Sequence, residues 1–383
     1  MLTPYCLKMP GRVFGGRGSL NEIENIVRGK KRIAIFTDKG IENAGLLEVP
    51  LEMLKKAGCS YAVLNELPAE PTYMQAQTAI DHFRETGAEM IMAVGGGSVM
   101  DIAKLASIAA TDAYTVKDML DQPLIGKKQI RTLLIPTTAG TGSEATPNSI
   151  VAVPEKELKV GIVNPEMMAD FVILDSLMIK KLPLKIAAAT GIDTLAHAVE
   201  CYTSNKANAF SNLFAMEALK LIFGNIEKAC MDQEAMNEKD NMLLAAFYGG
   251  VAITSSGTTG VHALSYPLGG KYHIAHGVSN AMLLVPVMRF NQDACLDELE
   301  HIHDEVKMGD ERKSKEDKAE TVLKRMQEII TTLQIPSSLA EFQVSEKDLD
   351  ALVEAGMQVT RLLDNNRKKI TPEDARKIYQ EIM

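Results

Sequence analysis

The stretch that decides the fold is EMIMAVGGGSVMDIAK, residues 89–104. An apolar run of strand length opens it, and a segment with helical spacing closes it. Between the two, Gly95, Gly96 and Gly97 let the backbone turn sharply and approach a ligand closely. Ser98 is a favourable helix N-cap residue, and the N–H groups at the start of such a helix can bind a pyrophosphate. The stretch predicts either a phosphate site or a tight structural turn, because it lacks the usual G-x-G-x-x-G spacing.

Further strands and helices alternate on both sides of this stretch. The apolar runs at 32–38, 61–67, 131–138 and 169–175 read as strands, and residues 48–58 and 72–87 have helical spacing. Such alternation is typical of a parallel sheet with helices on both faces. The runs are nearly continuous in apolar residues, as expected for strands that are buried on both sides.

The strand pattern nearly vanishes after about residue 180. Helical periodicity instead runs through residues 184–204, 211–230, 234–253 and 318–335. We therefore expect an α/β dinucleotide-binding domain at 1–179 and an all-helical metal-binding, catalytic domain at 180–383. The charged run at 304–320 is expected to be a solvated surface segment.

The composition excludes several classes of protein. The chain has 383 residues, of which 46% are hydrophobic and 24% charged, as in ordinary globular proteins. Its net charge of −9 gives no general basic surface, so we expect neither a nucleic acid nor a membrane as a partner. No apolar run reaches about 18 residues, and the N-terminus lacks the apolar core of a signal peptide. The five cysteines include no Cys-x-x-Cys pair, which favours reduced thiols and a cytoplasmic location.

Two further segments of the first half place polar side chains at strand ends. Asp38 closes the strand at 32–38, where its carboxylate can bind ribose hydroxyls or cap a helix. The loop IPTTAGTGSEAT, residues 135–146, offers the hydroxyls of Thr137, Thr138 and Ser143. Because ligands of open α/β sheets bind beyond the carboxyl ends of the strands, these segments and the glycine turn predict one dinucleotide site.

The helical half carries a pattern typical of a metal site. In GIDTLAHAVECYTS, residues 191–204, Asp193 and His197 lie four positions apart and so on one helix face. The apolar neighbours predict a partly buried helix, where a carboxylate is costly unless its charge is compensated. Either a solvated helix edge or a bound cation explains the pair. Three of only seven histidines, His262, His273 and His276, fall within fifteen residues, and imidazole with carboxylate suits Fe(II) or Zn(II).

The other histidines and the nearby cysteine favour plainer interpretations. His301 and His303 lie in a charged segment and are expected to be solvated, and His82 is expected on a helix surface. Cys201 is expected to be a buried structural cysteine.

The chain resembles the iron-containing (group III) alcohol dehydrogenase family over essentially its full length. The motifs GGGSVMDIAK, IPTTAGTGSEAT, GIDTLAHAVECYTS and HALSYPLGGKYHIAHGVSNAMLLVPVM follow one another in the family's order. Together they are far more specific than any one alone. The resemblance implies an N-terminal Rossmann-like domain and a C-terminal all-helical domain, with the active site in the cleft between them. It also implies a homodimer.

The resemblance assigns residues motif by motif. The metal ligands it implies are Asp193, His197, His262 and His276, for Fe(II) or alternatively Zn(II). The cofactor positions it implies are Gly96, Gly97, Ser98, Asp101, Thr137, Thr138, Ser143 and Lys159. Asp38 matches the acidic residue associated with NAD rather than NADP, and Lys39 stands next to it.

One position departs from the family. A histidine often precedes the PLG motif and faces the substrate, whereas this chain has Tyr266 there and a further histidine, His273, where other members vary. Tyr266 and His273 are therefore the candidate catalytic residues for proton transfer and substrate contact. A tyrosine hydroxyl and an imidazole favour a short aldehyde with a polar or anionic end. In the alternative, Tyr266 only packs and His273 faces solvent.

The predicted activity is hydride transfer between NAD(H) and a small alcohol or aldehyde, with a divalent metal as Lewis acid. Two rival functions remain open at this point. A lyase of the dehydroquinate synthase type would share the architecture, NAD and metal, but would need a basic phosphate pocket in the helical half. A non-catalytic nucleotide-binding protein would not need the four metal-type residues.

Overall fold

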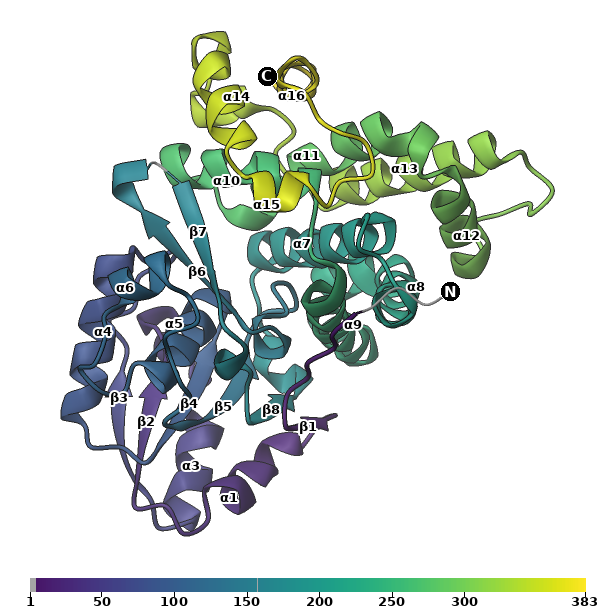
Figure 1. Ribbon diagram of the computed structural model, residues 1–383. Coiled ribbons are helices and arrows are strands. Elements are labelled where there is room, and N and C mark those ends of the chain that lie inside the picture. Colours follow the sequence, from purple (N-terminus) through teal and green to yellow (C-terminus); the bar gives the residue numbers. More distant parts are fainter. Residues whose placement is uncertain (1–4, 157) are drawn as a thin grey trace. The chain divides into compact units, whose positions relative to one another are not determined.

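The computed structural model describes residues 5–156 and 158–383. They form two compact units, one of residues Lys8–Leu182 and one of Pro183–Met383 with residues 5–7 (Figure 1). The chain passes from one unit to the other close to residue 180, where the sequence pattern changes.

The first unit is built on a six-stranded sheet with the order β1-β8-β5-β4-β2-β3. Every neighbouring pair in it is parallel. Its strands are β1 (Arg12–Gly15), β2 (Arg32–Phe36), β3 (Ser60–Leu64), β4 (Met90–Gly95), β5 (Arg131–Pro136) and β8 (Phe171–Leu174). Its helices are α1 (Glu22–Val27), α2 (Lys39–Asn43), α3 (Glu48–Lys56), α4 (Tyr73–Glu85), α5 (Gly97–Ile108) and α6 (Val116–Asp121). The parallel α/β architecture predicted for this half is confirmed, although β3 ends at Leu64 rather than at residue 67.

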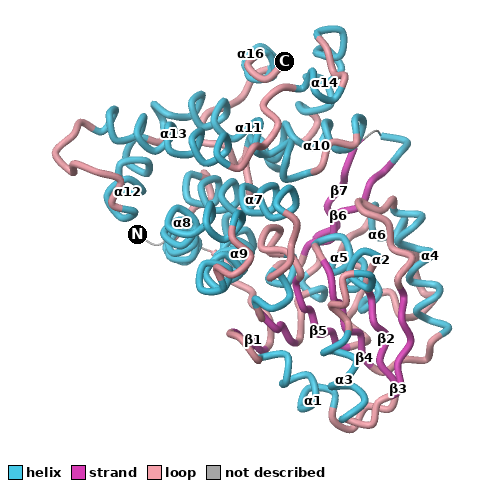
Figure 2. The backbone as a smooth tube through the Cα atoms, turned by 180° about the vertical axis from the view of Figure 1, so that it is seen from behind, coloured by secondary structure: helices cyan, strands magenta, loops and turns pink. Residues whose placement is uncertain are grey.

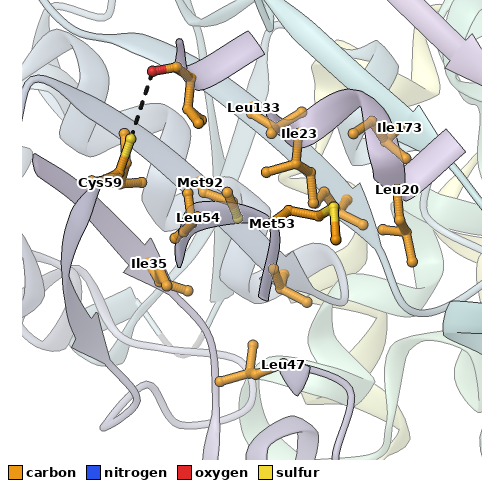
Figure 3. Close-up of a cluster of buried hydrophobic side chains, with 14 of the residues drawn as sticks. Leu20, Ile23, Ile35, Leu47, Met53, Leu54, Cys59, Met92, Leu133 and Ile173 are labelled. Carbon is orange, nitrogen blue, oxygen red and sulfur yellow. Dashed lines mark hydrogen bonds between the residues drawn. The ribbon is translucent and has the colours of Figure 1, made fainter. Parts of the chain in front are cut away.

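Both faces of the sheet are covered, because successive side chains of a strand point to opposite sides. Ile35 of β2 joins Met53 and Leu54 of α3 in a buried apolar cluster that extends over one face (Figure 3). The next residue, Phe36, points the other way and contacts Phe83 of α4 at a ring distance of 5.8 Å. This two-sided burial explains why the strands are almost continuously apolar in sequence.

The strand order reverses direction between β2 and β4. From β2 the chain first adds β3 on one side and then β4 on the other. In open parallel sheets, ligands bind beyond the carboxyl ends of strands at such a switch point. Asp38 follows β2 there, and the turn at Gly96 and Gly97 follows β4, so the fold places both predicted cofactor segments at one position on the sheet edge.

A separate two-stranded antiparallel hairpin was not predicted. It consists of β6 (Asn148–Val153) and β7 (Leu158–Val163), and Lys159 lies on β7. Every second residue of β6 is buried and the residues between them are partly buried, so one face of the hairpin packs inward.

The second unit is helical throughout its described residues, as predicted (Figure 2). Its helices are α7 (Leu184–Thr203), α8 (Ala209–Met231), α9 (Met236–Ser256), α10 (Gly260–Tyr272), α11 (His276–Asn291), α12 (Leu296–Val306), α13 (Lys315–Thr332), α14 (Leu349–Met357), α15 (Thr360–Leu363) and α16 (Pro372–Gln380). α7 packs against α8, α9 and α11 and is buried along most of its length. Among the described residues, no helix has the length and apolar character needed to cross a bilayer.

Candidate metal centre and dinucleotide site

Three of the predicted metal ligands converge inside the helical unit. Asp193 comes from α7, His262 from α10 and His276 from the first position of α11, and their ligand atoms all lie within 4.8 Å of one another. Oδ1 of Asp193 is 3.6 Å from Nε2 of His262 and 3.8 Å from Nε2 of His276. Asp193 and His262 are buried, whereas the His276 side chain is 29% exposed, so the group is accessible from the His276 side.

The fourth predicted ligand, His197, lies beside this group. It follows Asp193 by one turn of α7, and its Nε2 is 3.8 Å from Oδ1 of Asp193. Its ring stacks on that of His262 with a centroid distance of 4.7 Å. The four residues are therefore neighbours, although the set whose ligand atoms all lie within 4.8 Å contains only the other three.

The electrostatics of the group favour a cation. Burial by itself would raise the pKa of Asp193, but the imidazoles of His197, His276 and His262 hold it well below its usual range. Burial would also lower the pKa of His262, yet Glu200 and Asp193 outweigh burial and raise it to about 9. Without a cation, the two buried carboxylates therefore keep a proton on His262 at neutral pH, and a divalent cation that displaces this proton would supply the positive charge in its place.

Glu200 is a residue of this site that the sequence interpretation missed. Its buried carboxylate accepts the N–H groups of Thr259 and Val261 at 3.0 and 2.8 Å, at the start of α10, and the Thr259 hydroxyl at 2.8 Å. It also accepts a hydrogen bond from Nδ1 of His262. That bond leaves Nε2 of His262 as the nitrogen that can bind a metal. The signal was present, because Asp193, His197 and Glu200 occupy positions i, i+4 and i+7 of one helix face.

Asn280 of α11 supplies a test of whether a cation fits. Its amide nitrogen lies 2.7 Å from Oδ1 of Asp193, 3.1 Å from Nε2 of His262 and 3.2 Å from Nε2 of His276. An amide has two N–H groups and cannot satisfy three acceptors at once. Oδ1 of Asn280 is buried without a hydrogen-bond partner among the described residues. A carboxylate and two imidazoles converging on one point have the donor chemistry of a divalent transition-metal site.

The two candidate catalytic residues differ in their surroundings. Tyr266 lies one turn after His262 on α10, is buried, and has its ring 6.0 Å from that of His276. His273 ends α10 in the left-handed conformation, with φ of 54°, and is exposed. In the described part of the chain its imidazole makes no hydrogen bond or ring contact with the candidate ligands. Tyr266 is therefore placed beside the metal group, and His273 at the surface.

One surface assignment was wrong. His303 is fully buried, with Nδ1 2.8 Å from a carboxylate oxygen of Asp304, because α12 turns this face inward. His301 is exposed, as expected, and contacts Tyr202. Cys201 is buried, and burial raises the pKa of its thiol to about 12, which fits a structural role.

The glycine turn of the first unit has the features of an anion site. Gly96, not Ser98 as predicted, is the N-cap of α5, and no side chain caps this helix. A Cβ on Gly97 would lie 2.8 Å from the Thr141 side chain, and a Cβ on Gly95 would lie 2.6 Å from Cβ of Val99. The turn therefore requires glycine, and it leaves the first N–H groups of α5 without a side-chain acceptor.

Ser98 and Lys159 are joined through a residue that the sequence interpretation missed. The hydroxyl oxygen of Ser98 accepts the backbone N–H of Glu70 at 3.2 Å. The Glu70 carboxylate pairs with Nζ of Lys159 at 2.7 Å. Glu70 has a φ of 51°, which is uncommon for this residue type and is often found at functional sites. The β6–β7 hairpin is thereby tied to the loop before α4 at the edge where the dinucleotide segments lie.

The remaining predicted cofactor residues have defined partners. Asp101 accepts a hydrogen bond from the Ser143 hydroxyl and another, at 2.8 Å, from the N–H of Ile150. The first of these bonds fixes Asp101 and Ser143 relative to each other. Thr137 is buried next to β4, and its N–H donates a hydrogen bond to the carbonyl oxygen of Gly95 at 3.0 Å. Its hydroxyl oxygen has no hydrogen-bond partner among the described residues. Thr138 is half-buried beside Gly96.

Asp38 caps a helix in this structure. Its Oδ1 accepts the N–H of Ile41 at 2.9 Å, which makes it the N-cap of α2. The neighbouring Lys39 pairs with Glu66 at 2.8 Å on the surface. The capping alternative is thus observed, and it uses one of the two carboxylate oxygens.

Comparisons with known proteins cover both units. Two protein-family models match the sequence. The family model for iron-containing alcohol dehydrogenase matches residues 10–176, and the one for the C-terminal part of the Fe-containing alcohol dehydrogenase family matches residues 187–383. The chain is 32% identical to long-chain-alcohol dehydrogenase 1 of Geobacillus thermodenitrificans, covering 95% of this chain and 93% of that one. It is 27% identical to the NAD-dependent methanol dehydrogenase of Bacillus methanolicus, covering 96% and 97%.

A solved structure shares the whole fold. The crystal structure of a 1,3-propanediol oxidoreductase has a TM-score of 0.93 and 27% sequence identity, with 100% of both chains covered. The match of both family models, the identity over nearly the full chain and the convergence of Asp193, His262 and His276 agree. The chain therefore belongs to the iron-containing alcohol dehydrogenase family of oxidoreductases.

Proposed function

We propose that the protein is a metal- and NAD(H)-dependent alcohol dehydrogenase or aldehyde reductase that acts on small alcohols and aldehydes. The observation that carries the proposal is the convergence of Asp193, His262 and His276 from three helices on one point. The relative from Bacillus methanolicus is named as NAD-dependent, and this chain has Asp38 at the switch point of its sheet. Relatives are named for substrates as different as methanol and long-chain alcohols, so the substrate is proposed from this chain's own residues.

The helical unit would hold the metal through Asp193, His197, His262 and His276, with Fe(II) proposed and Zn(II) as the alternative. When bound, the cation would act as a Lewis acid that polarises the substrate oxygen, and the dinucleotide would carry the hydride. Glu200 fixes the tautomer of His262, which keeps Nε2 directed at Asp193. Tyr266 bounds the site next to His276, where its hydroxyl can donate a hydrogen bond to a polar substrate group. His273 lies at the surface, three residues before His276.

The first unit would hold the dinucleotide at the carboxyl ends of its strands. The uncapped N–H groups of Gly97 and Ser98 at the start of α5 suit the pyrophosphate. Thr137, Thr138 and Ser143 lie on the adjoining loop after β5, and Asp38 lies after β2. Asp101 supports this site by bonding Ser143, and Lys159 supports it through Glu70 and Ser98.

NAD is proposed rather than NADP. A second carboxylate oxygen of Asp38 remains beyond its capping bond and suits ribose hydroxyls, while its charge disfavours a 2′-phosphate. Lys39, the residue that could attract that phosphate, pairs with Glu66 instead.

Three broader expectations also remain proposals. The motifs support a domain boundary that separates a dinucleotide-binding domain, residues 1–179, from a metal-binding domain, residues 180–383. A homodimer is proposed from family membership and can be measured by light scattering after size exclusion. A cytoplasmic location is proposed because all five cysteines are free thiols.

The test combines metal content with activity. Chelation should abolish NADH-dependent aldehyde reduction, and Fe(II) or Zn(II) should restore it. His276→Ala should lose both bound metal, by elemental analysis, and activity, while NADH binding is retained. His82→Ala, which removes an exposed histidine of α4, is the matched control and should keep both. Full activity of a metal-free His276→Ala protein would overturn the proposal, and lyase activity on a phosphorylated acid without NADH turnover would favour the rival class.

A further inference from the structure

We propose that Lys104 is a positioning residue of the dinucleotide site, which fixes the loop at residues 143–146 against α5. This inference rests on the NAD(H) site proposed above and assigns to the Lys104 ammonium the role of holding its loop in place.

Lys104 is a fully buried lysine whose hydrogen bonds converge on one loop. It lies on α5, about two turns after Gly97, and its side chain has no exposed surface. Nζ donates to the carbonyl oxygens of Ser143 and Thr146 at 2.8 and 3.3 Å and lies 3.0 Å from Oδ1 of Asp101. Burial lowers the pKa of Lys104, while Asp101 and Glu144 oppose this shift. An ammonium is costly to bury unless its three donors are satisfied, and here the loop carbonyls and one carboxylate satisfy them.

The loop held by Lys104 reaches the start of α5. Ser143 donates its N–H to the hydroxyl oxygen of Thr141 at 3.2 Å, and its own hydroxyl donates to Asp101. The Thr141 side chain occupies the space where a Cβ of Gly97 would lie, at 2.8 Å. The position of the ammonium is thus transmitted through Ser143 and Thr141 to the helix end that is proposed to bind the pyrophosphate. A loop without this anchor would present its hydroxyls and the helix end in several arrangements, which weakens binding by loss of preorganisation.

The same unit contains a lysine with matched chemistry at another position. Nζ of Lys128 donates to the carbonyl of Met168 at 2.7 Å and lies 3.2 Å from Oδ2 of Asp170. Its side chain is 19% exposed. Asp170 immediately precedes β8 and also accepts the N–H of Thr132 near the start of β5, so this lysine supports the amino ends of the strands. Ligands of such sheets bind at the carboxyl ends, so Lys128 should contribute to stability without shaping the cofactor site.

The experiment compares Lys104→Met with Lys128→Met in the metal-loaded, full-length protein. The measurements are the dissociation constant of NADH by fluorescence titration, Tm by thermal unfolding, metal content and the separate kcat and KM values. Both variants should have a lower Tm and unchanged metal content. Only Lys104→Met should weaken NADH binding, by about tenfold or more, with kcat at saturating NADH within about threefold of the wild type, as expected for lost preorganisation.

Several results would overturn the positioning role. The role is refuted if a folded Lys104→Met protein binds NADH as tightly as the wild type. It is also refuted if Lys128→Met weakens NADH binding as much as Lys104→Met does. Lys104→Gln, which keeps an N–H donor, is the second variant and should bind NADH more tightly than Lys104→Met. If neither Lys104 variant folds while Lys128→Met does, Lys104 acts in stability alone and the inference fails. Absence of NADH binding by the wild-type protein would instead refute the proposed function.

Discussion

Glu200 and His262 form a buried hydrogen bond from the imidazole Nδ1 to a carboxylate oxygen, although 62 residues separate them in the chain. The same carboxylate accepts the N–H groups at the start of α10, the helix that carries His262. One side chain of α7 therefore fixes both the position of α10 and the tautomer of a candidate metal ligand.

Glu200→Gln should reduce metal affinity without unfolding the helical unit. The amide can still accept N–H groups at the start of α10, but it no longer supplies the negative charge that favours the Nδ1–H tautomer of His262. Loss of such a partner typically reduces metal affinity by about 10- to 100-fold. Metal titration followed by elemental analysis measures the effect. Glu217→Gln, which changes a surface carboxylate of α8, is the control, and equal affinity in the two variants would contradict the role of Glu200.

Asp38→Gly should narrow the preference for NADH over NADPH. The substitution removes the negative charge that would repel a 2′-phosphate, and it also removes the cap of α2, so a small decrease in Tm is expected as well. The ratio of kcat/KM for the two cofactors is the measurement. Asp38→Asn keeps a capping oxygen and separates the two effects. A wild-type preference for NADPH would show that Asp38 is misassigned, and Lys39 would then be the residue to change.

Tyr266→Phe should raise KM for short aldehydes with a polar or anionic end while metal content and NADH binding stay unchanged. The ring can still pack beside His276, but the hydroxyl that donates a hydrogen bond is lost. A panel of short carboxylated, phosphonated, sulfonated and unsubstituted aldehydes, compared with long alkyl aldehydes, measures the change. If the wild type turns over long alkyl aldehydes as well as the polar ones, the proposed pocket is wrong.

Glu144→Gln should flatten part of the pH profile of stability. Burial raises the pKa of Glu144 from 4.5 to about 7, against the opposing effect of Lys104. The folded state then binds this proton more tightly than the unfolded state, so its contribution to the free energy of unfolding is complete below pH of about 4.5 and is lost as the pH rises through about 7. The total effect is at most about 3.5 kcal/mol, since a pKa difference of one corresponds to about 1.4 kcal/mol. Chemical denaturation of both proteins at pH 5 to 8 measures the difference, and parallel curves would contradict this assignment.

The local fold was predictable because each segment carries its own periodicity. The apolar runs at 32–38 and 89–97 contain the strands β2 (Arg32–Phe36) and β4 (Met90–Gly95), and the segment at 184–204 contains helix α7. Burial on two faces, or along one stripe, leaves a direct mark on residue order. The β6–β7 hairpin was missed, because NSIVAV and LKVGIV lie close to stronger signals and carry no tight-turn motif of the usual kind. The N-cap of α5 is Gly96 and not the predicted Ser98. The glycine turn permits the helix to begin two residues earlier than the side-chain preference for N-cap positions indicates.

The sequence by itself determined the order of strands and helices, the change of character near residue 180, and the residue types that can hold a metal. Spacing of four residues places Asp193 and His197 on one helix face wherever that helix lies. Only the tertiary structure decided that His262 and His276 reach the same point, that Glu200 and Asn280 contact them, and that His303 is buried. The physical reason is that periodicity fixes which face of an element is apolar, whereas the contacts between distant elements depend on how all those faces pack at once.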